Sequence, residues 1–321
     1  MIKVQNLSKS FGSKVAVNDI SFSVERGEVL GFLGPNGAGK STTMRMITGF
    51  IPPTSGKITV GGFDILENPI PAKRLIGYLP ENAPAYTDMT VYGFLGFAAE
   101  LRGLYKDEKK KAIHRVVEMC FLEAVLHQSV DTLSKGYRHR TCFAQSIIHD
   151  AAVLILDEPT DGLDPNQKHE VRNLIRQMGA NKAIVFSTHI LEEVEAACSR
   201  AIIIDRGRIV ANGTPEELKQ KSDLAGAVSV RVLGMSAETV RQKLNQISIG
   251  RKAAIVKEDV TSVWARVYPQ ANSRNGDLAR SVAEISAKEG WKIEELHTEE
   301  GRLDEVFRSI TLPDTVKEES K

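Results

Sequence analysis

Short apolar runs alternate with polar, helix-forming stretches over the first two thirds of the chain. Val29–Leu33, Ala151–Leu156 and Ala183–Phe186 are almost wholly apolar, as expected for parallel strands that are buried on both faces. Ile2–Leu7 and Ile20–Val24 instead alternate apolar and polar residues, which is typical of antiparallel strands with one face in solvent. This alternation predicts an α/β domain that combines a parallel sheet with an antiparallel β subdomain.

A helical subdomain is predicted between two of the buried strands. Ile76–Leu79 has the composition of a strand, and the segments Thr90–Arg102 and Lys110–Leu126 have helical patterns, with Gly103 as a stop between them. A third helix is predicted over Arg140–His149, directly before the run Ala151–Leu156. Together these helices would form the helical subdomain.

The pattern changes near Lys219–Gly226, where we place a domain boundary. Beyond it, strands and helices are predicted in the order β-α-β-β-α-β, which indicates a small α+β ferredoxin-like sandwich. The predicted organisation is therefore a domain over residues 1–220, a second over 225–312 and a polar tail over 313–321. The predicted elements are Val228–Val232, Ala237–Ile247, Ala254–Lys257, Val260–Tyr268, Asp277–Lys288, Trp291–Leu296 and Leu303–Ile310.

Composition narrows the class of protein. The 321 residues carry a formal net charge of +1, so there is no general basic field for nucleic acid. Three cysteines are scattered without metal-ligand spacing, as in a cytoplasmic protein with buried thiols. No apolar stretch has the roughly 20 residues of a membrane helix, and the N-terminus has no signal-peptide pattern.

A glycine-rich loop, Gly34–Thr42, joins the strand Val29–Leu33 to a predicted helix over Thr42–Thr48. Its spacing, G-x-x-x-x-G-K-[ST] between a strand and a helix, is that of a phosphate-binding loop. Backbone N–H groups and the helix N-terminus would face the phosphates. Lys40 would reach the β- and γ-phosphates, and the hydroxyl of Ser41 would bind Mg²⁺. A glycine-rich turn that fits the pattern by chance is the alternative. The residues predicted to bind ATP are Asn36, Gly37, Ala38, Gly39, Lys40, Ser41 and Thr42.

Two carboxylates, Asp157 and Glu158, follow the buried run Ala151–Leu156. They would lie at the carboxyl edge of the sheet, where open α/β folds bind ligands. We expect Asp157 to hold Mg²⁺ through its water shell and Glu158 to orient or deprotonate an attacking water. His189 follows the next buried run and is predicted to contact the terminal phosphate. The alternatives are acidic strand-end caps and a surface histidine.

Ser134 and Gly136 lie just before the predicted helix Arg140–His149. A serine and a glycine at a helix N-terminus form a potential anion site. The alternative is an ordinary helix cap.

Together these motifs resemble the ATP-binding subunit of ABC transporters over residues 1–220. The resemblance implies a P-loop NTPase fold, an ATP site that includes Ser134, Gly136 and Asp164, and an adenine-stacking role for Phe11. A core position is the alternative for Phe11. The matching segments are Gly34–Thr42 (Walker A), Leu133–Tyr137 (signature), Leu154–Glu158 (Walker B with its catalytic glutamate), Gly162–Asp164 (D-loop) and His189 (switch histidine).

The chain departs from the family pattern at two places. Glu81 stands where the family usually has glutamine, and a carboxylate there could still meet Mg²⁺ or its water. The signature reads LSKGY in place of LSGGQ. Both variants, and the motif Leu303–Phe307, look like those of ABC-2-type subunits. The run Tyr78–Pro84 is similar to gliding-motility-associated and nitrous-oxide-reductase-maturation ATPases.

The resemblance implies a pair of chains, head to tail, that sandwiches two ATP molecules and closes on binding. It also implies a separate integral membrane permease that holds the protein on the cytoplasmic face of the membrane. We expect no nucleic acid as a partner, because the net charge is only +1. Alternatives are a soluble ABC-type ATPase that acts on ribosomes or DNA, and a nucleotide sensor without turnover. We place the permease on the surface Glu81–Gly103, unless its apolar side chains all pack inside the helical subdomain. These are Tyr86, Met89, Tyr92, Phe94, Leu95 and Phe97.

Overall fold

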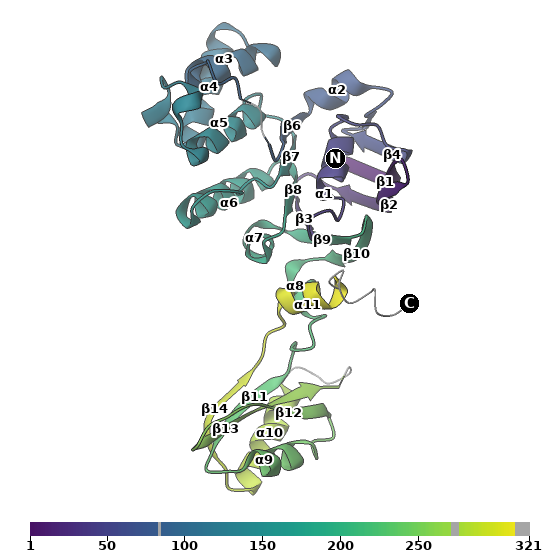
Figure 1. Cartoon of the computed structure of the whole chain (residues 1–321), viewed down its shortest axis with the longest axis vertical. Helices are drawn as coiled ribbons and strands as arrows, with labels where there is room; N and C mark the ends of the chain where they lie inside the picture. Colours follow the sequence, from purple (N-terminus) through teal and green to yellow (C-terminus); the bar gives the residue numbers. More distant parts are fainter. Residues whose placement is uncertain (83–84, 271–275, 312–321) are drawn as a thin grey trace. The chain divides into compact units, whose positions relative to one another are not determined.

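The computed structural model describes residues 1–82, 85–270 and 276–311. The chain divides into two compact units, Met1–Pro215 and Glu216–Lys321 (Figure 1). The predicted tail 313–321 lies outside the described residues, and the predicted domain limits stay a prediction. No helix in the described ranges is long and apolar enough to cross a membrane.

The first unit is built on a six-stranded sheet in the order β10-β9-β3-β8-β7-β6. Strands β3, β6, β7, β8 and β9 run parallel to one another, and the edge strand β10 pairs antiparallel with β9. Every residue of β3, β7 and β8 is buried, as their apolar sequences predict. The strands are β3 (Val29–Leu33), β6 (Ile76–Leu79), β7 (Val153–Asp157), β8 (Ala183–Thr188), β9 (Arg200–Asp205) and β10 (Arg208–Gly213).

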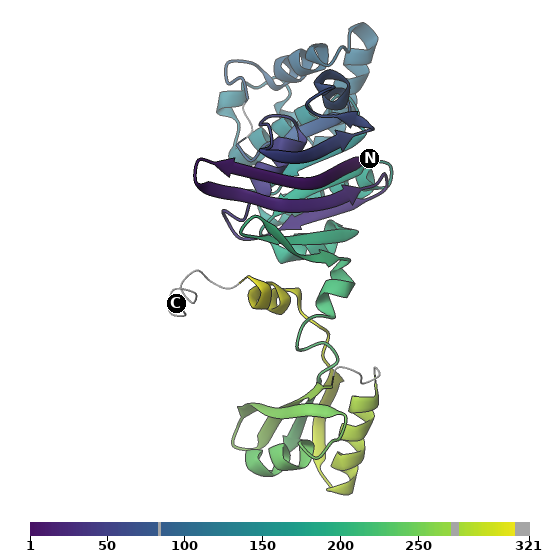
Figure 2. The same cartoon turned by 90° about the vertical axis from the view of Figure 1, so that its right-hand side faces the viewer.

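A second sheet of the same unit has the order β2-β1-β4-β5 and is antiparallel. Figure 2 shows its two long strands β1 and β2 side by side in purple. Helix α1 (Lys40–Ile47) buries Met44, Met46 and Ile47 in one core with both sheets, so the phosphate-loop helix is held from two sides. The strands are β1 (Ile2–Phe11), β2 (Lys14–Val24), β4 (Ser55–Val60) and β5 (Phe63–Asp64).

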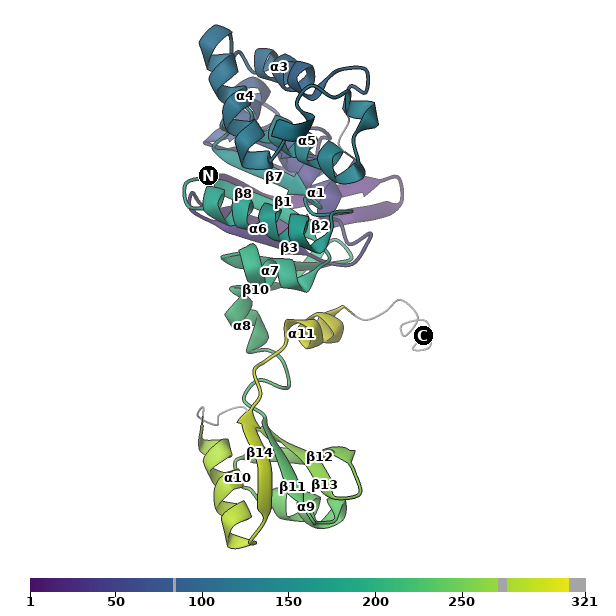
Figure 3. The ribbon, with the colours of Figure 1, turned by 90° about the vertical axis from the view of Figure 1, so that its left-hand side faces the viewer.

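Helices α3, α4 and α5 lie together, and α6 and α7 contact the parallel sheet (Figure 3). They share a core that includes Leu95, Phe143 and Phe186. The predicted helix Lys110–Leu126 is wrong at its end, because Phe121 has φ 56° and terminates α4. The helices of this unit are α2 (Pro69–Arg74), α3 (Val91–Leu101), α4 (Lys106–Cys120), α5 (Lys135–Ile147), α6 (Pro165–Gly179) and α7 (Leu191–Ala197), with 3₁₀ turns at Glu123–Val125 and Val130–Thr132.

The second unit has the predicted β-α-β-β-α-β order, with an antiparallel sheet arranged β12-β13-β11-β14. Helices α9 and α10 cover one face of this sheet. The elements are β11 (Val228–Leu233), α9 (Ala237–Leu244), β12 (Gly250–Glu258), β13 (Ser262–Pro269), α10 (Asp277–Lys288), β14 (Lys292–Thr298) and α11 (Leu303–Ile310), and α8 (Pro215–Lys219) spans the boundary in sequence. The ferredoxin-like prediction is confirmed in its topology.

Candidate functional site

The loop between β3 and α1 needs its glycines for two physical reasons. Gly37 and Gly39 have φ of 80° and 108°, in the left-handed region that residues with a Cβ rarely adopt. A Cβ on Gly39 would also lie 2.6 Å from the Ala16 carbonyl oxygen, and one on Gly34 would lie 2.4 Å from that of Ile204. The loop therefore packs closely against the carbonyl groups of Ala16 and Ile204. Its glycines allow the curved backbone that directs several N–H groups toward one phosphate.

Lys40 is the buried cation of this loop, with 6% of its side chain exposed. Its Nζ donates to the carbonyl oxygens of Gly34 at 2.7 Å and Pro35 at 3.2 Å. The same nitrogen lies 3.8 Å from Glu158 Oε1. Burial lowers the pKa of the Lys40 ammonium, and the nearby carboxylates, above all Glu158, oppose that shift.

Asp157, the last residue of β7, joins three segments of chain. Its Oδ1 accepts from Ser41 Oγ at 3.1 Å and from Ser187 Oγ at 2.5 Å. Its Oδ2 is buried and has no hydrogen-bond partner within the described ranges. A buried carboxylate oxygen that lacks a donor beside a serine hydroxyl fits Mg²⁺, whose remaining ligands would be phosphates and water.

Ser187 is a site residue that the sequence did not single out. Its hydroxyl donates to Asp157, and it accepts from the Glu158 backbone N–H at 3.0 Å. The signal that would have found it is strand register, because Asp157 and Ser187 are paired at the ends of β7 and β8.

Glu158 sits directly after β7 with φ 51°. A left-handed conformation in a residue other than glycine costs about 1–3 kcal/mol and must be imposed by its surroundings. Its Oε2 lies 2.9 Å from His189 Nδ1, so the structure brings the two predicted catalytic side chains together. Burial raises the pKa of the Glu158 carboxyl, while His189 and Lys40 oppose that rise.

A cavity of about 430 Å³ lies in front of these residues. Phe11 is half-exposed at this cavity and is therefore not a core side chain. Ala38, a residue of the phosphate loop itself, is buried. Glu81 is also part of the lining. Of the predicted residues, those that line it are Phe11, Asn36, Gly37, Gly39, Lys40, Ser41, Thr42, Glu81 and Glu158.

Five predicted ATP contacts are not among the described residues that line this cavity. They are Ala38, Ser134, Gly136, Asp164 and His189. Ser134 caps α5 and accepts from the Tyr137 N–H at 3.3 Å. Asp164 caps α6 and accepts from the Gln167 N–H at 2.9 Å. Within one chain Ser134 and Asp164 serve as helix caps, and Gly136 is a buried residue in the first turn of α5. The predicted role of all three in binding ATP remains a prediction.

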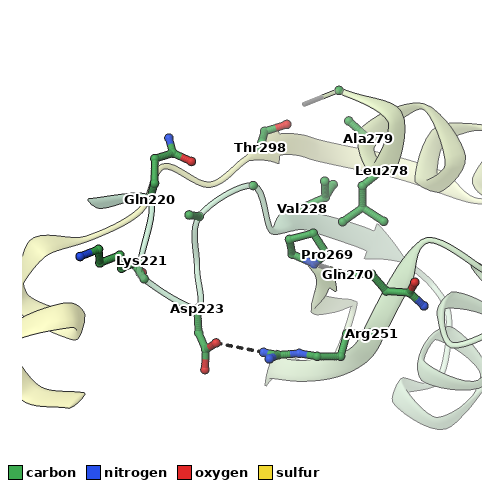
Figure 4. Close-up of a pocket in the computed structure, with 14 residues that line it drawn as sticks. Gln220, Lys221, Asp223, Val228, Arg251, Pro269, Gln270, Leu278, Ala279 and Thr298 are labelled. Atoms are coloured by element: carbon green, nitrogen blue, oxygen red, sulfur yellow. Dashed lines mark hydrogen bonds and ion pairs between the residues drawn. The ribbon is translucent and has the colours of Figure 1, made fainter. Parts of the chain in front are cut away.

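A second cavity, of about 390 Å³, lies in the second unit (Figure 4). Its lining includes Asp223 and Arg251, which form an ion pair with each other at 3.1 Å. The phosphate loop and the Asp157–Glu158 pair belong to the first unit, so the chemistry of the site is assigned to the 430 Å³ cavity.

Comparison with known proteins supports this assignment. The sequence profile of the ABC transporter family matches residues 17–161. The linearmycin resistance ATP-binding protein LnrL of Bacillus subtilis is 38% identical over 219 residues, which are 68% of this chain and 70% of that protein. A solved structure of the ATP-binding subunit of an ABC transporter, 30% identical, superposes with a TM-score of 0.64 over 69% of this chain and 92% of the other.

One relative is similar over both units. The cholesterol transporter ABCA5 of Rattus norvegicus is 31% identical over 307 residues, which are 93% of this chain and 18% of that protein. The first unit ends at Pro215, so a match of this length includes residues of the second unit.

We predict that Lys40→Ala weakens ATP binding at least about tenfold, because it removes a charge-assisted contact worth about 1.5–3 kcal/mol. Titration of the purified chain with a fluorescent ATP analogue measures this. Lys110→Ala, which removes an exposed lysine of α4, is the matched control and leaves the affinity unchanged. Equal affinity in the two variants would contradict the placement of the phosphates.

We predict that Glu158→Gln lowers the rate of ATP hydrolysis by at least about 10²-fold while ATP still binds, because proton transfer contributes roughly 10²–10⁴-fold. The raised pKa of Glu158 adds a pH test. The carboxylate must be ionised to accept a proton, so the wild-type rate falls as pH drops through a pKa above the ordinary glutamate range. The residual rate of the Glu158→Gln variant does not show this fall at low pH. Near-normal turnover by Glu158→Gln would remove Glu158 from the role.

Proposed function

The chain belongs to the family of ABC transporter ATP-binding proteins, and we propose that it is the ATP-hydrolysing subunit of an ABC-2-type transporter that works in the export direction. The observation that carries the proposal is the contact of Glu158 with both His189 and Lys40, at 2.9 and 3.8 Å, beside the phosphate loop. A base, a polar group that orients it and a cation for the terminal phosphate are the parts that hydrolysis of ATP needs.

In the proposed reaction, Glu158 accepts a proton from water as the water oxygen bonds to the γ-phosphorus and the bond to ADP breaks. Lys40 stabilises the negative charge on the phosphates. His189, which is predicted to contact the terminal phosphate, also holds the Glu158 carboxylate in place. Ser41 and Asp157 would hold Mg²⁺, with Glu81 facing its water. Bound Mg²⁺ supplies positive charge that neutralises the β- and γ-phosphates.

The proposed working state is a head-to-tail pair of chains. Ser134 and Gly136 at the N-terminus of α5 would contact the ATP held by the phosphate loop of the partner, close to Asp164. Support comes from Ser134, which is exposed and lies outside the cavity that the same chain forms, whereas Gly136 is buried in the first turn of α5. ATP closes the pair because it binds the closed state more tightly, and hydrolysis reopens it.

Assignment to the ABC-2 type rests on sequence variants. The signature LSKGY, the glutamate at position 81 and the motif Leu303–Phe307 support it, and that motif forms α11. The finer likeness to gliding-motility-associated or nitrous-oxide-reductase-maturation ATPases is part of the same proposal.

We place an integral membrane permease against the helical subdomain, which would hold this subunit on the cytoplasmic face of the membrane. Of the aromatic residues in this segment, Phe94 is buried in the core, whereas Tyr86 and Tyr92 are 54% and 41% exposed. The Tyr86 ring contacts Phe97 edge to face at 5.4 Å between centroids. An exposed aromatic surface of this kind suits a short amphipathic helix of the permease.

Mixing two inactive variants tests the head-to-tail pair. Lys40→Ala damages the phosphate loop and Ser134→Arg blocks the helix end, so each variant alone is expected to be inactive. In a mixed pair, one site combines an intact loop with an intact helix end, and we expect hydrolysis to return to roughly a quarter to a half of wild type. If each chain completed its own site, mixing would restore nothing.

Membrane attachment tests the permease surface. We predict that Tyr86→Glu and Tyr92→Glu each release at least about half of the protein from membranes of the producing cells, because a charge is costly to bury at an interface, while ATP binding is kept. Tyr105→Glu is the control, since Tyr105 is 60% exposed on the same subdomain but lies outside the proposed surface. Release by all three variants, or by none, would contradict this placement.

A further inference from the structure

Glu193 on α7 is a buried acidic residue that the proposed reaction does not use. Only 1% of it is exposed, and burying a carboxylate is costly unless its oxygens receive hydrogen bonds. Both oxygens do receive them, and from threonine hydroxyls. Oε1 accepts from Thr160 Oγ1, and Oε2 accepts from Thr188 Oγ1 at 2.7 Å.

The two threonines belong to the two segments that carry the catalytic side chains. Thr160 lies two residues after Glu158, and Thr188 lies immediately before His189. Since His189 Nδ1 contacts Glu158 Oε2 at 2.9 Å, the contacts close a ring. It runs from Glu158 along the chain to Thr160, through Glu193 to Thr188, along the chain to His189 and back to Glu158.

The hydroxyl of Thr188 is oriented by its own neighbour. Its oxygen accepts from the Ile190 N–H at 3.0 Å, so its single hydrogen is available to Glu193. These hydrogen bonds therefore connect the end of β8 to the start of α7 and to the carboxylate of Glu193. They fix the backbone on both sides of His189.

Glu158 requires such support because its backbone is left-handed. On one side its N–H is held by Ser187 Oγ. On the other side the turn that follows Glu158 is held through Thr160, which is 3% exposed and bonded to Glu193. Strained conformations persist where the surroundings fix them from several directions.

We propose that Glu193 is a positioning residue for ATP hydrolysis. Through its hydrogen bonds to Thr160 and Thr188 it connects the turn after β7 to the end of β8, and so fixes Glu158 and His189 relative to each other. The proposal rests on the proposed hydrolytic role of Glu158. Glu193 acts on the reacting groups only through the two threonines. It is therefore expected to affect the turnover rate and to leave the affinity for ATP, which depends on the phosphate loop, nearly unchanged.

The test compares Glu193→Gln, Thr160→Val and Thr188→Val in the full-length chain, with Glu192→Gln as the matched control on the same helix. Glu192 is exposed. Single-turnover hydrolysis and ATP affinity are measured for each variant, both in the wild-type background and together with Glu158→Gln. Thermal unfolding identifies folded variants. The near-isosteric Thr160→Val decides the outcome if Glu193→Gln does not fold.

We expect Glu193→Gln and Thr160→Val to slow turnover by at least about tenfold, with ATP affinity within about threefold of wild type. In the Glu158→Gln background the same changes lower the residual rate less than about twofold, because the group that they position is already gone. The Glu192→Gln control behaves like wild type.

Equal rate losses in both backgrounds, or a matching loss of ATP affinity, would show a general structural role and overturn the proposal. Wild-type turnover by Glu193→Gln and Thr160→Val, with Glu158→Gln inactive, would also overturn it and leave the proposed function intact. Full turnover by Glu158→Gln alone would instead overturn the proposed site, and this inference with it.

Discussion

The site depends on hydrogen bonds to one buried oxygen, Asp157 Oδ1. Ser41 from the phosphate-loop helix and Ser187 from β8 both donate to it, so it fixes three segments that are distant in sequence. The parallel register of the sheet makes this possible, because β3, β7 and β8 end at the same edge. A one-residue shift of β8 would turn Ser187 away from Asp157 and invert every buried side chain of that strand.

Much of this arrangement could be predicted from sequence where local pattern decides structure. The buried strands, the phosphate loop and the placement of Glu158 and His189 at one edge of the sheet follow from apolar runs and from the residues that end them. No predicted element corresponds to the strands β4 and β5 or to the helices α2, α6, α7 and α8. The end of α4 was misplaced because nothing in the residue type of Phe121 announces a left-handed conformation.

The contacts that sequence could not supply are long-range. Ser187 and Thr160 are small hydroxyl residues of ordinary composition, and their partners lie on other elements. Glu193 stands next to Glu192 in a helix, and the two differ only in the face that they occupy. Glu193 lies on the same buried face of the helix as Ala197, four residues further along the chain. This spacing is the local sequence feature that indicates burial of Glu193 and not of Glu192. The second unit was easier, since its alternating strands and short helices are set by local pattern.

The loop that binds phosphate also binds its own lysine. Lys40 is already bonded to two carbonyl oxygens of that loop, those of Gly34 and Pro35. The ammonium has three N–H donors, so a phosphate oxygen can accept the third one, and it competes with the loop carbonyls for any further hydrogen bond. Any part of this self-contact that is given up on binding lowers the net affinity and raises the threshold concentration at which the site fills. Changes in the loop backbone that weaken those two contacts would tune this threshold while every residue that touches the nucleotide stays the same.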